Sequence, residues 1–314
     1  MKVDNSIFFG RVQKMFRHYS KRAKKQSITC FRFYDRDIPS FPLSIDFYDQ
    51  KLYVCIYKHP YYTTDKQLEE FYPILYKILC ESCAVNSDDI FIREREKMRD
   101  KNQYEKLNKN ASIFTITENG LKFYINLSDY LDTWLFLDHR LTRAFVKEET
   151  NGKDFLNLFC YTGSFSVYAA AGNAKSTTSV DISKTYLDIA KKNMALNGFS
   201  GNNHEFIKED VFQFLENSKS NSYDLIVLDP PTFSKSKAMK HILDIERDHP
   251  ELILNCLRLL RNNGVLYFSN NSKKFRLRME LPEGVECKDY TKRSIPFDFQ
   301  RKNLPHVCYR FKKS

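Results

Sequence analysis

The feature that most constrains the fold is an apolar run that ends in an acid and two prolines, "YDLIVLDPP". Because Leu225 to Leu228 show no polar alternation, this run predicts a strand covered on both faces, as in the middle of a parallel sheet. Pro230 and Pro231 cannot donate to a sheet ladder, so the strand must end there. We therefore expect Asp229 at the carboxyl end of the strand, the edge where open α/β sheets bind ligands.

Strand and helix patterns alternate regularly around this run, from "DFLNLF" to "VLYFSNN". Such alternation predicts a doubly wound parallel sheet, a Rossmann-like α/β domain that we place over residues 129–314. Gly198 and Gly264 stand where helix C-caps are expected. The stretches "GVECKDYTKRSIPFDF" and "HVCYRFKK" can supply two closing strands.

A smaller α/β module, with an RNA-binding or other accessory role, is predicted over residues 1–110. It would hold a basic helix near 6–25, strands in "ITCFRFYD" and "KLYVCIYKH", and a helix over "TTDKQLEEFYPILYKILCESCAV". The highly charged stretch 93–110 is expected to be a linker or an exposed loop. Asn119-Gly120 predicts a connecting β-hairpin over 111–128, because a type I′ turn needs positive φ at both central residues.

The charge balance favours a polyanionic partner. The 314 residues include 50 Lys and Arg against 39 Asp and Glu, a formal net charge of +11. Net positive charge attracts nucleic acid in particular, and the basic helix near 6–25 would add a second basic surface.

Cysteines and apolar segments indicate the compartment. The eight cysteines are scattered through apolar stretches, which suits reduced thiols in a cytosolic protein. The C-x-x-C pair Cys80 and Cys83 has no second pair at finger spacing, so we predict no metal site. No apolar run approaches the length of a membrane span and the N-terminus lacks a secretory core, so we expect a cytoplasmic protein without a membrane partner.

The loop in "NLFCYTGSFSVY" predicts the cofactor class. Its single turn glycine, Gly163, lets the backbone approach a ligand at a helix N-terminus. A nicotinamide dinucleotide needs the richer G-x-G-x-x-G loop for its pyrophosphate, so this loop argues against NAD and permits a nucleoside such as S-adenosylmethionine.

Three acids follow successive strands of the predicted sheet. Asp181 ends the second strand, where an acid can accept hydrogen bonds from ribose hydroxyls. Asp210 ends the third strand, suitably placed to meet an adenine amino group, and Asp229 ends the fourth. Any one of these acids could merely cap the next helix. Together with the glycine turn, the set favours a cofactor site.

Longer sequence segments narrow the resemblance to one family. "DYLDTWLFLDHR", "YDLIVLDPPTFSKSK" and "LYFSNNSKKFRL" resemble the C-terminal half of the bifunctional bacterial 23S rRNA methyltransferases, which forms N7-methylguanine in large-subunit RNA. The similarity extends into the N-terminal module through "CFRFYDRDIPSFPLSID" and "KNQYEKL". It implies S-adenosylmethionine as cofactor and 23S rRNA or the assembling large ribosomal subunit as partner. The family protein also carries a second, N-terminal methyltransferase with its own RNA-binding domain, which is missing here, so we expect one reaction and unaided RNA recognition.

By this resemblance, the segment 130–140 lies over the methionine end of the cofactor. The other interpretation of "WLFLDHR" is the amphipathic start of a helix, with Trp134, Leu135 and Leu137 in the core. The residues that we assign to cofactor binding are Phe136, Asp138, Arg140, Asn157, Phe159, Tyr161, Thr162, Gly163, Asp181, Asp210 and Asp229.

Methylation of guanine N7 needs positioning rather than a general base, because the lone pair is already nucleophilic and no proton leaves. We expect Asp229 to accept from the guanine N1–H and amino group, beside Pro230. Phe233 would stack on the base, and Asn270 or Asn271 would donate toward O6. The residues expected to contact RNA phosphates are Lys235, Lys237, Lys273, Lys274 and Arg276.

Other functions stay open at this point. Enzymes that methylate exocyclic amines usually present [D/N]-P-P-[Y/F]; here Thr232 separates Pro231 from Phe233, so guanine N2 or adenine N6 is the second candidate. A cytosine-C5 enzyme needs a cysteine thiolate, and its relatives carry one in the loop after the fifth strand, where this chain has Ser269-Asn270-Asn271. A small-molecule methyltransferase and a non-catalytic RNA-binding ribosome-assembly factor are more distant alternatives.

Overall fold

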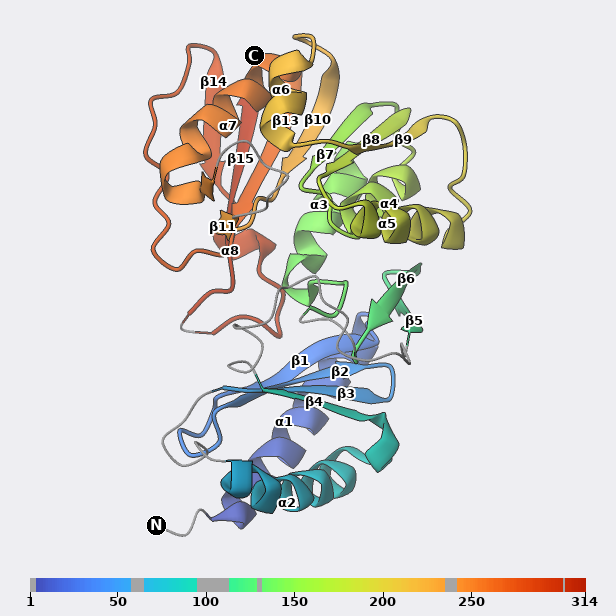
Figure 1. Cartoon of the computed structure of the whole chain (residues 1–314), viewed down its shortest axis with the longest axis vertical. Helices are drawn as coiled ribbons and strands as arrows, with labels where there is room; N and C mark the ends of the chain where they lie inside the picture. The colour runs from blue at the N-terminus through green and yellow to red at the C-terminus, as the bar shows by residue number, and fades with distance from the viewer. Residues whose placement is uncertain (1–3, 58–64, 95–112, 129–131, 235–241, 302) are drawn as a thin grey trace. The chain divides into compact units, whose positions relative to one another are not determined.

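The computed structural model describes residues 4–57, 65–94, 113–128, 132–234, 242–301 and 303–314 (Figure 1). The chain divides into two compact units, Met1–Leu137 and Asp138–Ser314. The hairpin that the sequence predicts as a connector lies within the first unit. Among the described helices, none combines the length and the apolarity that a membrane crossing requires.

The first unit is a four-stranded sheet with two helices packed beneath it (Figure 1). Its strand order is β1-β2-β3-β4, antiparallel except for the parallel pair β3 and β4. The Phe41 ring stacks on Phe8 of α1 at 4.1 Å and lies 6.1 Å from Phe71 of α2. The elements are α1 (Asn5–Lys25), β1 (Cys30–Asp35), β2 (Leu43–Tyr48), β3 (Lys51–Ile56), α2 (Asp65–Cys83) and β4 (Ile90–Glu94).

The predicted hairpin is confirmed. β5 (Ile113–Glu118) pairs with β6 (Leu121–Asn126), and Glu118 faces Leu121 across a two-residue turn. Asn119 and Gly120 have φ values of 50° and 79°, as a type I′ turn requires.

The second unit is a seven-stranded sheet with the order β14-β15-β13-β10-β7-β8-β9. The five strands from β13 to β9 are parallel, and the two predicted closing strands, β14 and β15, are antiparallel. The strands are β7 (Asp154–Leu158), β8 (Ser176–Asp181), β9 (His204–Lys208), β10 (Tyr223–Leu228), β13 (Leu260–Asn270), β14 (Val285–Asp289) and β15 (Val307–Lys313).

Helices cover both faces of this sheet (Figure 1). They are α3 (Arg140–Glu149), α4 (Ser164–Ala171), α5 (Lys184–Leu196), α6 (Val211–Asn217), α7 (Ile245–Leu259) and α8 (Thr291–Ser294), preceded by the 3-10 turn η2 (Leu137–His139). A short ribbon of β11 (Phe233–Ser234) and β12 (Leu243–Asp244) follows β10. Chain order reverses between β10 and β7, which is the point where open α/β sheets form their ligand crevice.

β10 is buried on both faces, as its apolar run predicts. Leu225 and Val227 pack with Val146 of α3 on one face. Ile226 and Leu228 pack into the cluster that includes α6 and α7 on the other. The doubly wound prediction is therefore confirmed, and Asp229 follows directly at the strand's carboxyl end.

Of the two predicted helix-ending glycines, one is confirmed and one is wrong. Gly198 has φ +81° and its N–H donates to the Ala195 carbonyl, closing α5. By contrast, α7 ends at Leu259, and Leu260 already has extended backbone and begins β13. Gly264 therefore lies inside a strand, because pairing with β10 starts at Leu260 and resumes after a register shift.

Candidate active site

The loop between β7 and α4 has an unusual backbone. Phe159, Tyr161 and Gly163 have φ values of 54°, 51° and 74°, a conformation that is unfavourable for residues with a side chain. Hydrogen bonds to β8 hold the loop: the Cys160 N–H donates to the Val180 carbonyl at 3.0 Å, and the Tyr161 N–H to Asp181 Oδ2 at 2.9 Å. The loop is thus shaped by the neighbouring strand.

Gly163 permits a close approach between helices. A Cβ at this position would lie 2.7 Å from Ala190 Cβ and 3.1 Å from Ala190 Cα, closer than such atoms pack. Glycine is therefore required twice, for its positive φ and for the contact of the α4 N-terminus with α5.

Asp181 and Asp210, both predicted to meet the cofactor, differ in their bonding. Asp181 is buried at the end of β8 and accepts from the backbone of Tyr161 and of Ser183. Burial raises its pKa to about 6, although these backbone hydrogen bonds favour the charged form. Asp210 Oδ1 accepts from the Phe212 N–H at 2.8 Å and caps α6, so the capping alternative describes this acid, and its cofactor role stays a prediction.

Asn157 and Thr162 support the loop from within the fold. The buried Asn157 amide donates to Ser166 Oγ of α4 at 2.9 Å. The Thr162 carbonyl accepts from the Asn193 amide of α5 at 2.9 Å. Both predicted cofactor residues thus bond to the helices that flank the loop.

The Asp-Pro-Pro corner is held by the end of β13. Ser269 Oγ donates to Asp229 Oδ1 at 2.6 Å, and the Asn270 amide donates to the Pro230 carbonyl at 3.1 Å. Partial burial raises the Asp229 pKa to about 6, opposed by the Ser269 hydrogen bond. Ser269 therefore has a direct effect on the predicted base-contacting acid.

Some of the residues predicted to contact the base are exposed to solvent, and others are buried. Phe233 is 52 % exposed, as a stacking platform needs. Asn271 is exposed and its Oδ1 accepts from Thr232 Oγ1. Asn270 is fully buried and its amide is engaged by the corner. Of the two asparagines expected to reach O6, Asn271 is accessible, whereas the buried Asn270 amide bonds to the Pro230 carbonyl.

The predicted RNA-contacting cations that can be placed follow β13. Lys273, Lys274 and Arg276 are exposed around the buried Phe275. Lys235 and Lys237 lie outside the described residues. Phe136 belongs to the first unit, where its side chain is 43 % exposed.

Two histidines lie beside Asp229 that the sequence analysis did not predict as site residues. The His139 and His306 rings stack at 4.1 Å with an interplanar angle of 11°, and His139 Nε2 lies 3.7 Å from Asp229 Oδ2. His306 bonds through Nδ1 to Asp138 at 2.9 Å and through Nε2 to Ser294 at 3.0 Å. Asp138 and His306 are 168 positions apart, so no local pattern could pair them.

Burial lowers the pKa of His139 and of His306, partly offset by Asp138, so both rings are neutral near pH 7. Donor atoms of Asp138, His139 and His306 lie within 4.8 Å of one another, a spacing that could hold a metal ion. Because both His306 nitrogens already bond to protein groups, the arrangement favours an internal hydrogen-bonded cluster. Asp138, predicted for the cofactor, is part of that cluster.

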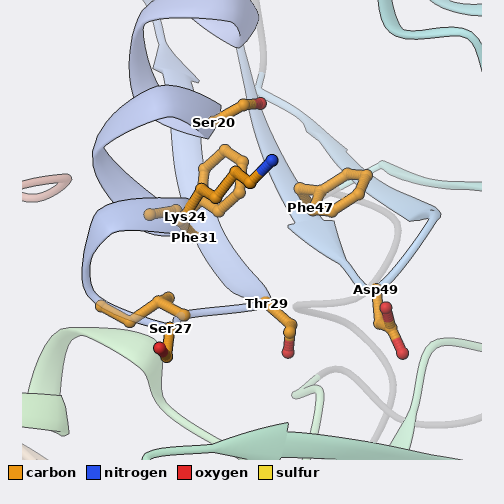
Figure 2. A pocket seen from close by; sticks show the side chains of 9 residues that line it. Ser20, Lys24, Ser27, Thr29, Phe31, Phe47 and Asp49 are labelled. Carbon is orange, nitrogen blue, oxygen red and sulfur yellow. The ribbon is translucent and has the colours of Figure 1, made fainter.

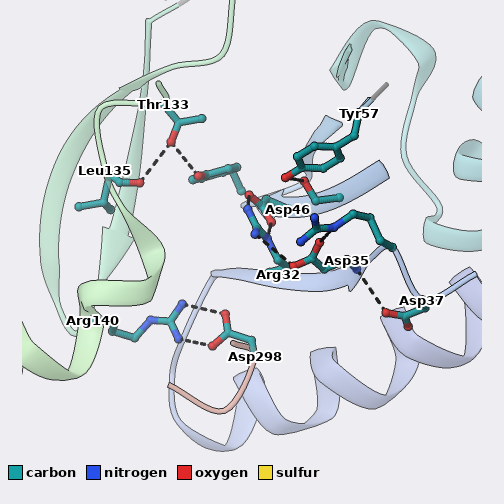
Figure 3. Close-up of polar contacts among 12 residues, drawn as sticks. Arg32, Asp35, Asp37, Asp46, Tyr57, Thr133, Leu135, Arg140 and Asp298 are labelled. Carbon is teal, nitrogen blue, oxygen red and sulfur yellow. Dashed lines mark hydrogen bonds and ion pairs between the residues drawn. The ribbon is translucent and has the colours of Figure 1, made fainter. Parts of the chain in front are cut away.

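Arg140 forms a buried ion pair with Asp298 (Figure 3). The guanidinium donates to both carboxylate oxygens at 3.0 and 3.3 Å, and the two residues are 1 % and 0 % exposed. This pair ties the start of α3 to the segment before β15. The predicted contact of Arg140 with the cofactor stays a prediction.

Comparison with known proteins identifies similar sequences over nearly the whole chain. A family model described as S-adenosylmethionine-dependent methyltransferase matches residues 34–266. The ribosomal RNA large subunit methyltransferase K of Neisseria meningitidis serogroup B is 43 % identical over 312 residues, which cover 99 % of this chain and 88 % of that protein. A ribosomal RNA large subunit methyltransferase K/L of Vibrio cholerae is 42 % identical over 96 % of this chain, but the match spans only 43 % of that longer protein.

Solved structures share the fold. A Streptococcus mutans protein described as a SAM-dependent methyltransferase aligns with a TM-score of 0.75 at 22 % identity, over 99 % of this chain and 82 % of that one. The methyltransferase-like protein SMU.776, solved with S-adenosylhomocysteine (SAH), aligns with a TM-score of 0.78 at 23 % identity and the same coverage.

Proposed function

Because the chain belongs to the S-adenosylmethionine-dependent methyltransferase family, we propose that it methylates N7 of a guanine in large-subunit ribosomal RNA. S-adenosylmethionine is the methyl donor. The relatives named for large-subunit ribosomal RNA support the substrate class. Such a substrate would place the protein in the cytoplasm, with 23S rRNA or the assembling large subunit as partner.

The second unit, Asp138–Ser314, contains residues that suit the binding of S-adenosylmethionine. The loop from Phe159 to Gly163 and the buried carboxylate of Asp181 meet at the carboxyl ends of β7 and β8. In our proposal Asp181 accepts from the ribose hydroxyls and the loop backbone lies against the nucleoside. When bound, S-adenosylmethionine supplies a methyl group on a positively charged sulfur.

The observation that carries the base assignment is the braced corner of Asp229. Ser269 and Asn270 fix its carboxylate and the following carbonyl beside an exposed Phe233. We propose that the Asp229 carboxylate accepts from the guanine N1–H and amino group while Phe233 stacks on the ring. As N7 becomes methylated, positive charge develops on the base, so a fixed carboxylate at its opposite edge stabilises the transition state more than the ground state.

The thiols argue against cytosine-C5 chemistry, which needs a thiolate. Cys160, Cys256 and Cys308 are buried. Burial raises the pKa of each, that of Cys308 to about 12. All three are therefore neutral thiols near pH 7, and the position after β13 is occupied by Ser269 and two asparagines.

Methylation of an exocyclic amine stays the second candidate function, and the Asp-Pro-Pro motif is its only support. That chemistry uses a backbone carbonyl beside the acid as an acceptor for the amino group. Here the Pro230 carbonyl already accepts from Asn270, and Thr232 shifts the aromatic by one position. Both features favour N7 over guanine N2 or adenine N6.

The direct test is to incubate the purified protein and labelled S-adenosylmethionine with large-subunit RNA from cells that lack its gene, and to identify the labelled nucleoside by mass spectrometry. We expect label in N7-methylguanosine. Label in another nucleoside would overturn the atom assignment but keep the methyltransferase. If naked RNA stays unlabelled, assembling particles are the next substrate, and failure there as well as with RNA would favour the non-catalytic assembly factor.

A variant tests the role of the corner. Asp229→Ala should lose most of the turnover at saturating S-adenosylmethionine, and calorimetry measures separately whether the variant also loses cofactor affinity, as the assignment of Asp229 to cofactor binding predicts. Full turnover with intact cofactor affinity would remove Asp229 from the base site.

A further inference from the structure

The first unit contains an open pocket that the proposed reaction does not use (Figure 2). It has a volume of about 450 Å³ and lies where α1 ends against β1 and the β2–β3 turn. The residues that line it are Ser20, Ala23, Lys24, Ser27, Ile28, Thr29, Phe31, Phe47 and Asp49.

The pocket combines an aromatic wall with polar groups. Phe31 and Phe47 face each other across β1 and β2, with ring centroids 5.2 Å apart. Phe31 is buried and Phe47 is partly exposed, so Phe47 presents the accessible ring. Lys24 and Asp49 also line the pocket, and among the described residues neither has an ion-pair partner (Figure 2).

The helix that ends at this pocket is uniformly cationic. α1 contains no Asp or Glu. Five exposed cations on it, none paired with an acid of the described chain, are Lys14, Arg17, Lys21, Lys24 and Lys25. Arg11, by comparison, is neutralised by Asp37 at 2.8 Å. The free cations therefore gather toward the C-terminal half of α1, on the approach to the pocket.

A membrane surface is a poor match for this helix. A membrane-binding helix inserts its apolar face into the lipid, whereas Phe8, Val12 and Ala23 of α1 are buried within the protein. The exposed side of α1 is mainly basic and polar, and Ile7 is an isolated exposed apolar residue near its start. A polyanion whose units also carry flat rings fits both the cations and the aromatic wall.

We propose that this pocket binds one unpaired nucleotide of the RNA substrate. The base stacks on Phe47, Lys24 contacts its phosphate with Lys21 and Lys25 on the adjoining nucleotides, and Asp49 accepts from a base amino group or a ribose hydroxyl. The inference rests on the proposed function only in taking RNA as the substrate.

Binding of a fluorescent single-stranded RNA to the full chain tests the pocket without requiring methylation. Phe47→Leu removes the ring but keeps an apolar side chain, and it should weaken binding about tenfold. Lys24→Gln should weaken binding and lower the slope of log K against log salt by about 0.7. Lys77→Gln, an exposed lysine of α2 with the same charge change, should leave both unchanged.

The variant Asp49→Asn distinguishes binding of a nucleotide in the pocket from purely electrostatic attraction of RNA to the surface. Asp49 has φ 43°, a conformation that asparagine tolerates, so the turn should form. Loss of a negative charge strengthens any purely electrostatic contact with phosphates. If Asp49 accepts from the nucleotide, the variant instead weakens binding or changes base preference.

The outcomes are distinguishable from those of the methylation assay. Weaker binding in Phe47→Leu and Asp49→Asn, with unchanged thermal unfolding, supports the pocket even if no methylated nucleoside is found. Loss on Lys24→Gln alone, with tighter binding by Asp49→Asn, overturns it in favour of a general cationic surface. Normal RNA binding by all pocket variants, or binding of anionic vesicles but not RNA, also overturns it.

Discussion

Two glycines of the second unit differ in why they need to be glycine, and substitution can measure each reason separately. Gly163 combines a positive φ with a close contact to Ala190, whereas Gly198 has a positive φ of 81° and no atom within 4 Å of an added Cβ. The two positions therefore form a matched pair for backbone strain and for overpacking.

Gly198→Ala should lower the free energy of unfolding by about 1 kcal/mol, the usual effect of a side chain at left-handed φ. Gly163→Ala should lower it by roughly 2 to 4 kcal/mol, because overpacking against Ala190 adds to that strain. Denaturant unfolding measures both, and calorimetry should show weaker S-adenosylmethionine binding for Gly163→Ala only. Equal losses in the two variants would mean that α5 moves aside freely.

The pKa of Asp229 predicts the pH dependence of the reaction. Its pKa lies near 6, so the acid is protonated below that pH and ionised above it. Since the carboxylate is the accepting form, methyl transfer at saturating cofactor should rise through about pH 6 and then level off. Saturation removes the separate effect of Asp181, which also titrates near 6.

Ser269→Ala should move this pH profile to higher pH, because the lost hydrogen bond favours the carboxylate. Ser272→Ala, which removes a neighbouring hydroxyl bonded to Glu246 instead, serves as the control. A profile that stays in place in Ser269→Ala would show that Asp229 is not the titrating group.

At the scale of elements, the buried pair of Arg140 and Asp298 joins α3 to the segment before β15. Arg140→Met should lower the free energy of unfolding by about 3 to 5 kcal/mol, because it leaves a buried carboxylate without its partner. The double variant Arg140→Met/Asp298→Leu should recover most of that loss in denaturant unfolding. Cofactor affinity then tests the sequence prediction: it returns in the double variant if Arg140 is structural, and it stays low if Arg140 binds the cofactor.

Elements with strong local patterns could be predicted from the sequence, and those defined by distant partners could not. The run before Asp229 and the turn at Asn119-Gly120 each contain their own signal. β2 was not predicted, although the alternation of Leu43, Ser44, Ile45, Asp46 and Phe47 is a strand pattern. β4 was not predicted because its five residues carry no such alternation and its pairing with β3 decides its structure.

The same distinction holds within the site. The acids Asp181, Asp210 and Asp229 were predictable because each stands where one element of the alternating pattern ends: Asp181 is the last residue of β8, Asp210 comes between β9 and α6, and Asp229 follows β10. The stacked histidines were not, since they come from opposite ends of the second unit and meet only after folding. Asn270 was expected to contact the base, because nothing in the sequence indicates that its amide bonds to the Pro230 carbonyl instead.

At the scale of the whole molecule, a net charge of +11 predicts that RNA affinity depends strongly on salt. Lys273→Gln/Lys274→Gln should lower the slope of log K against log salt by about 0.7 per lysine that contacts phosphate. Lys192→Gln/Lys219→Gln, which changes two other exposed lysines, is the control for net charge alone. Equal slopes in both double variants would indicate that the segment after β13 does not contact phosphates.

The loop after β7 also bears on how the protein behaves over many turnovers. Its left-handed residues and its bonds to β8 constrain its shape through the fold itself. A site of fixed shape binds the parts that two ligands share equally well. A methyl donor and its demethylated product differ only in one methyl group and in the positive charge on the sulfur that carries it. We therefore expect strong product inhibition, so that in the cell the ratio of donor to product, rather than donor concentration, would set the rate of RNA modification.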